Sequence, residues 1–131
     1  ASRWYPETLS RRIHAIVAIR ERITFIEGDG LAVAQQYAHD PQIAFFIDPP
    51  YTASAKRAGS RLYLYSEVDH SELFRLASTF AGDFLMTYDV AQELYTLAAH
   101  YGFDTELVAM KNTHNAAMTE LLIGRDLNWA R

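Results

Sequence analysis

Apolar residues recur at helical spacing near the start of the chain, between residues 7 and 21. Charged residues, including Arg11, Arg12 and Arg20, lie largely on the opposite side of the same helical projection. Pro6 precedes this stretch and suits the first turn of a helix. The pattern predicts an amphipathic helix over residues 7–21. Its apolar positions are Leu9, Ile13, Ile16 and Val17, with Ile23 just beyond them.

Short apolar runs alternate with helical patterns along the rest of the chain. Runs of β-branched and aromatic residues predict strands over residues 23–27, 43–47 and 83–88. Helical patterns predict helices over residues 31–38 and 90–101, the latter ended by Gly102, and a helix through Phe80 that Asp69 or Ser71 can cap. Between them, residues 49–66 show no clean period and predict a long loop. Two final strands, over residues 103–110 and 119–123, predict a hairpin with an eight-residue loop.

Strands that alternate with helices predict an α/β fold with a mostly parallel sheet, to which the C-terminal hairpin adds one antiparallel strand. A length of 131 residues predicts one domain. Half of the residues are hydrophobic and 21% are charged, which is typical of a globular core and excludes a disordered chain.

Composition also limits the class of partner. No apolar run approaches the roughly 18 residues that span a bilayer, so no membrane association is expected. There is no cysteine, and the five histidines show no metal-ligand spacing, so we expect a cytoplasmic protein without disulfides or a metal site. The net charge of −4 argues mildly against nucleic-acid binding. However, Lys56, Arg57 and Arg61 share one loop without acids, and such a loop can contact phosphates.

The run of residues with the clearest chemistry is the apolar strand that leads directly into Asp48-Pro49-Pro50-Tyr51. The carboxyl end of a buried strand opens onto the ligand crevice of an α/β sheet. Two successive prolines fix φ and remove two N–H donors, so the loop is stiff and rich in acceptors. Acceptors beside an aromatic ring suit a planar heterocycle that carries an exocyclic amine. The alternative interpretation is an ordinary turn that ends a strand.

This motif resembles the catalytic motif of the N6-adenine DNA methyltransferases, in the branch that includes the Dam-like enzymes. Phe25 to Gly30 resembles the family's segment that contacts the adenine of S-adenosylmethionine, and residues 111–115 and 119–124 resemble its C-terminal hairpin. The resemblance covers nearly the whole chain in the family's order. It implies part of a Rossmann-like S-adenosylmethionine-dependent methyltransferase sheet, with double-stranded DNA as substrate.

The resemblance also assigns roles to individual residues. Asp48, Pro49, Pro50 and Tyr51 would be catalytic: the acceptors hold the amine of an adenine flipped out of the duplex, and Tyr51 stacks on it. The cofactor-binding residues would be Asp29, Gly30 and Asp48. DNA would be contacted by Lys56, Arg57, Arg61, Lys111, Asn112 and His114. The alternative interpretations are that Asp29 caps the helix that follows it, that His114 is only an exposed residue, and that the basic loop is only a solvated surface.

One part of the family's pattern is absent from these 131 residues. The family carries a Gly-rich Phe-x-Gly-x-Gly loop under the methionine part of the cofactor, and none of the six glycines forms Gly-x-Gly in that context. The family places this loop and its target recognition domain earlier in the gene. We therefore interpret residues 1–131 as a single partial catalytic domain, expected to self-associate or to need a companion N-terminal half.

Three functions are compatible with the sequence. The first is site-specific DNA adenine-N6 methylation, for which this chain is the C-terminal part and is inactive alone. The second is methylation of an exocyclic amine in RNA, because related motifs occur in such enzymes. The third is a non-catalytic remnant or interaction module, which the missing Gly-rich loop favours. The aspartate version of the motif and the C-terminal hairpin favour the first.

Overall fold

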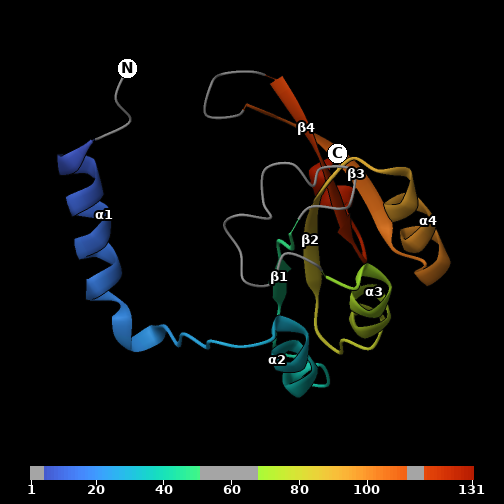
Figure 1. Ribbon diagram of the computed structural model, residues 1–131, viewed down its shortest axis with the longest axis horizontal. Helices are drawn as coiled ribbons and strands as arrows, with labels where there is room; N and C mark the ends of the chain where they lie inside the picture. The colour runs from blue at the N-terminus through green and yellow to red at the C-terminus, as the bar shows by residue number, and fades with distance from the viewer. Residues whose placement is uncertain (1–4, 51–67, 112–116) are drawn as a thin grey trace.

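The computed structural model describes residues 5–50, 68–111 and 117–131 (Figure 1). Helices and strands alternate along the chain, so the mixed α/β class is confirmed. The strands of the described residues are β1 (Phe45–Ile47), β2 (Phe84–Asp89), β3 (Asp104–Lys111) and β4 (Ala117–Gly124). They form one sheet in the order β1-β2-β4-β3.

The sheet differs from the expected mostly parallel arrangement. Strands β1 and β2 pair in parallel, whereas the β2–β4 and β4–β3 pairs are antiparallel. The reason is that β4, the return strand of the predicted hairpin, lies between β2 and β3. Strands β1, β2 and β3 therefore run in one direction, and β4 alone runs against them.

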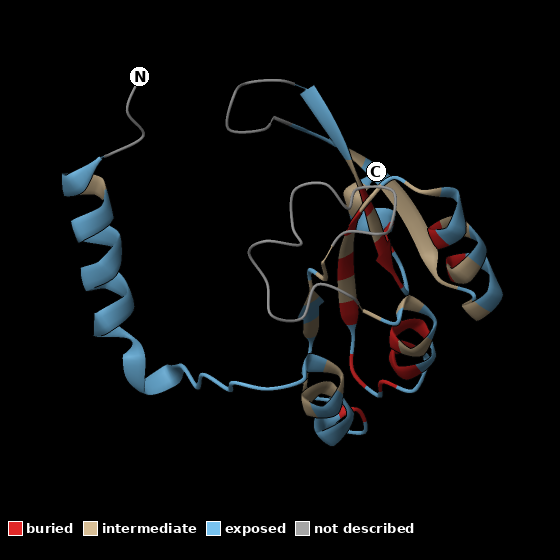
Figure 2. Ribbon diagram, in the orientation of Figure 1, coloured by how far each residue is buried: buried red, intermediate tan, exposed pale blue. Residues whose placement is uncertain are grey.

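One face of the sheet is covered by a layer of helices, α2 (Gly30–Tyr37), α3 (His70–Ser78) and α4 (Gln92–Tyr101). Alternate residues of β2 point toward this layer and are buried, namely Phe84, Met86 and Tyr88. The ring of Phe74 on α3 is fully buried and lies 6.1 Å from that of Tyr88, centroid to centroid. This helix-covered face holds the hydrophobic core (Figure 2).

Local sequence explains how the covering helices begin and end. The Asp69 carboxylate caps α3 by accepting a hydrogen bond from the Glu72 amide at 3.0 Å. Helix α3 then buries the stripe Leu73, Phe74, Leu76 and Ala77. Helix α4 ends at Gly102, whose φ of 71° lies in the left-handed region, which confirms the predicted stop.

Residues 5–28, which we call the arm, lie apart from this body (Figure 1). The predicted N-terminal helix is present as α1 (Pro6–Ala18), followed by a 3-10 turn, η1 (Arg20–Arg22), and neither contains a buried residue. The strand predicted over residues 23–27 is wrong, because these residues are extended without forming a strand. A strand needs a neighbour to satisfy its backbone groups, and no described strand lies beside this segment.

The opposite face of the sheet is partly covered by the C-terminal 3-10 turn η3 (Asn128–Ala130). Arg131, after this turn, forms ion pairs with Asp104 at 2.7 Å and Glu106 at 2.9 Å on β3. Among the described helices, none is long and apolar enough to cross a membrane.

Candidate functional site

The carboxyl ends of three strands meet at one edge of the sheet, because β1, β2 and β3 run in the same direction. Asp48 directly follows β1, Asp89 ends β2 and Lys111 ends β3. Strand β4 begins at the same edge, where Ala117 pairs with Lys111. Asp48 therefore lies on the side of the sheet at which β3 ends and β4 begins.

Asp48 is exposed and is held by the neighbouring strand. The register pairs Ile47 with Met86, so the next residues along, Asp48 and Thr87, lie side by side. The Thr87 hydroxyl donates a hydrogen bond to Asp48 Oδ1 over 2.9 Å. The two prolines that follow, Pro49 and Pro50, are half-buried. The Asp48 carboxylate is therefore exposed to solvent, and one of its two oxygens, Oδ1, is held by the hydrogen bond from Thr87.

Acidic groups dominate the described part of this edge. Asp89 on β2 lies opposite Glu120 on β4 in the antiparallel register, so both carboxylates stand on the same face as Thr87. A surface of this kind offers acceptors to N–H donors and repels phosphates.

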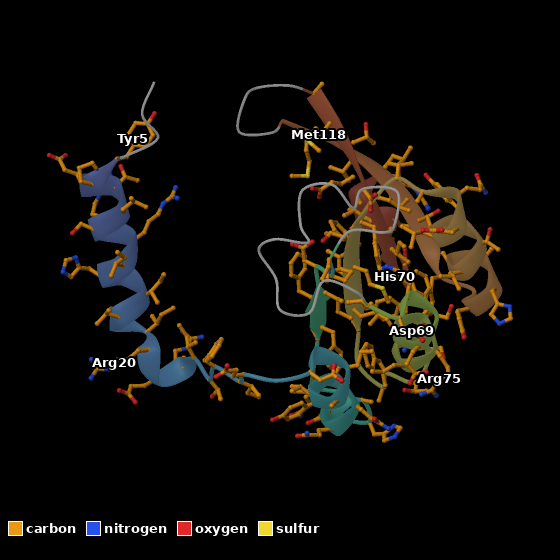
Figure 3. The ribbon with its side chains drawn as sticks, viewed as in Figure 1. Tyr5, Arg20, Asp69, His70, Arg75 and Met118 are labelled. Atoms are coloured by element: carbon orange, nitrogen blue, oxygen red, sulfur yellow. The ribbon has the colours of Figure 1, made fainter. Side chains whose placement is uncertain are left out.

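His70, labelled in Figure 3, lies at the start of α3 and forms a polar contact with Tyr88 of β2 on the helix-covered face. His70 Nδ1 and the Tyr88 hydroxyl are 3.1 Å apart. Burial lowers the pKa of His70, against the opposing influence of Glu93, Asp69 and Asp89. Burial also raises the pKa of the Tyr88 hydroxyl, with Asp89 adding to the effect. Both shifts favour a neutral imidazole that accepts a hydrogen bond from the protonated Tyr88 hydroxyl.

The predicted cofactor segment is only partly suited to its role. The Asp29 carboxylate accepts a hydrogen bond from the Leu31 amide at 2.9 Å and caps α2. Among the described residues, none comes within 4 Å of the place that a side chain would take at Gly28 or Gly30. Asp29 accepts its hydrogen bond from Leu31, and Asp48 accepts its hydrogen bond from Thr87. These hydrogen bonds do not connect Asp29 with Asp48. The segment therefore presents two exposed carboxylates, those of Glu27 and Asp29.

Several predicted site residues fall outside the described part of the chain. They are Tyr51, Lys56, Arg57, Arg61, Asn112 and His114. Lys111 is placed at the end of β3 by its backbone. The described residues thus test the position of Asp48, Pro49, Pro50, Asp29 and Gly30, and the predicted DNA contacts stay predictions.

Thr87 is a residue of this edge that sequence reasoning did not single out. It is a polar residue within the apolar strand Phe84–Asp89, on the face opposite Met86 and Tyr88. Its polarity in such a strand was a usable signal. Its contact with Asp48 was not predictable, because the sequence does not say that β2 pairs directly with β1.

Comparison of the chain with protein-family models finds no match, and a search of curated proteins finds none either.

Proposed function

We propose that this chain is the C-terminal catalytic part of a DNA adenine-N6 methyltransferase. The observation that carries the proposal is the placement of Asp48 at the carboxyl end of β1, exposed at the sheet edge and held by Thr87. The Asp-Pro-Pro-Tyr motif predicts a carboxylate of this kind, supported by a strand and open to a ligand.

The arrangement of the sheet supports the same proposal. Three strands share one direction, and the C-terminal hairpin inserts one opposed strand between β2 and β3. The resemblance implies a Rossmann-like methyltransferase sheet with this single antiparallel strand. If the resemblance holds, the described sheet is the part that begins with the motif strand β1. The remaining strands of the family's sheet would then pair with the edge of β1 that faces away from β2.

The chemical role of the motif follows from what an adenine amine lacks. Its nitrogen lone pair is delocalised into the ring, so the amine is a poor nucleophile. Asp48 and the Pro49 carbonyl would accept hydrogen bonds from its two N–H groups. This favours a tetrahedral nitrogen and directs its lone pair toward the methyl group of the cofactor. The contribution of these residues is orientation and electrostatic complementarity.

S-adenosylmethionine would supply the methyl group. In this chain Asp29 offers one acceptor for the adenine end of that cofactor, and the residues for its methionine end are not among the 131. We therefore propose that the complete enzyme combines this chain with a companion half that carries the Gly-rich loop. The chain alone should bind the cofactor weakly and should not methylate DNA.

The test is methyl transfer from radiolabelled S-adenosylmethionine to duplex DNA by the complete enzyme, with and without Asp48→Ala. Loss of a group that stabilises the transition state should lower kcat by about 100-fold or more. Asp126→Ala is the matched control, because Asp126 is also an exposed aspartate. It follows β4, which ends where β2 and β3 begin, away from Asp48. Equal turnover by the Asp48 variant and the natural enzyme would rule out the catalytic assignment.

Two further measurements separate the alternatives. Transfer to RNA in preference to duplex DNA would redirect the proposal to RNA amine methylation. Isothermal titration of the complete protein with S-adenosylmethionine identifies a non-catalytic module, because such a module has no cofactor site and should give no heat.

A further inference from the structure

We infer that Thr87 is the positioning residue of the reaction, because its hydroxyl holds the Asp48 carboxylate in the orientation that receives the substrate amine. This inference rests on the proposed function. It adds to the motif a residue that lies 39 positions along the chain and on a different strand.

The pairing of β1 with β2 brings these two side chains together. Strands β1 and β2 are paired in parallel with Ile47 beside Met86. Side chains alternate along a strand, so Thr87 points away from the buried Met86 and Tyr88 and toward the face that carries Asp48. The pairing of β1 with β2 therefore sets the distance between the hydroxyl and the carboxylate.

The direction of the hydrogen bond determines which oxygen is left for the substrate. An ionised carboxylate only accepts, so the Thr87 hydroxyl must be the donor to Asp48 Oδ1. That bond fixes the rotation of the carboxyl group and leaves Oδ2 directed away from Thr87. Threonine is β-branched, and its side-chain rotation is restricted, so the donor itself is held in place.

The test compares three variants of the complete enzyme in the labelled-methyl assay on duplex DNA. Thr87→Val keeps the branched shape but removes the donor, and should lower kcat by about 10-fold to 100-fold with little change in the KM of either substrate. Thr87→Ser keeps the donor and should restore most of the activity. Thr105→Val is the matched control. Thr105 lies near the start of β3, the strand of the described sheet that is farthest from β1.

The outcomes distinguish this inference from the function on which it rests. Full kcat in Thr87→Val, while Asp48→Ala is inactive, would overturn the positioning role and leave the proposed function standing. A natural enzyme that transfers no methyl group, or that is insensitive to Asp48→Ala, would remove both. A loss in Thr87→Val that Thr87→Ser does not restore would assign the effect to packing and would also overturn the inference. Thermal unfolding of each variant verifies that the fold is retained.

Discussion

The arm and the body of this molecule contain apolar residues in comparable patterns, yet only the body buries them. Helix α3 and helix α1 are both amphipathic, and α3 places Phe74 in the core with no exposed surface. On the arm, Ile13 is 59% exposed and Phe25 is 86% exposed. Figure 2 shows the same contrast, with buried residues in the body and none on the described part of the arm.

The contrast between arm and body separates two properties of an amphipathic segment, its ability to form a helix and the burial of its apolar face. Helical periodicity determines whether a segment can form a helix with an apolar face, and α1 does so. Burial requires a second surface at the right distance, and that information is not in the segment itself. An exposed apolar stripe of this kind is typical of a surface made for a partner, in agreement with the proposed companion half.

The largest expected effect comes from the aromatic core of the body. Phe74→Ala should lower the free energy of unfolding of the chain by about 3–5 kcal/mol, because it removes a fully buried ring. Phe25→Ala makes the same change on the arm and should alter it by no more than about 0.5 kcal/mol. Urea unfolding monitored by circular dichroism measures both. Equal losses in the two variants would mean that the arm packs on the body in solution.

A smaller effect should follow pH through His70, which is half-buried where α3 contacts β2. Its pKa in the folded chain lies below the ordinary value of 6.5, because burial disfavours the charged ring. The unfolded chain therefore binds the proton more readily, and this part of the stability is complete above pH 6.5 and is lost as the pH falls below it.

Urea unfolding at pH 7.5 and at pH 5.5 tests this dependence. In His70→Asn the decrease in stability between the two pH values should be smaller than in the natural chain. His14→Asn on the exposed arm serves as the control for removal of a histidine. An identical decrease in the His70 variant and the natural chain would contradict the prediction.

The smallest effect should come from removing most of the arm. A chain that begins at Gly28 should melt within about 2 °C of the full chain, because neither α1 nor η1 contains a buried residue to lose. Differential scanning calorimetry measures the difference. A decrease of several degrees would show that the apolar stripe of α1 already has a partner, either the body or a second copy.

Much of the fold was predictable because local patterns carry it. The helix that Gly102 ends, the Asp69 cap region and the C-terminal hairpin follow from turn and cap chemistry within a few residues. The strand at residues 23–27 was not correctly predicted, because β-branched residues favour a strand only where a neighbouring strand is present. The sheet order was also beyond reach, since it depends on which strands meet across long stretches of sequence.

The candidate site divides in the same way. Asp48, Pro49 and Pro50 are contiguous, so their motif is visible in the sequence and the structure places them at a strand end. Thr87 joins them only through the β1–β2 register, and His70 meets Tyr88 only because α3 packs on β2. Residues that act through tertiary contacts leave no contiguous signal.

The interior position of β4 has a consequence for synthesis of the chain. Strand β4 follows β3 in the sequence but lies between β2 and β3, so neither of them can complete its pairing until residues 117–124 have left the ribosome. Until then the nascent chain exposes two unpaired strand edges, which are sites of misassociation. Slow translation just before β4 should therefore lower the yield of soluble protein more than the same delay before α4.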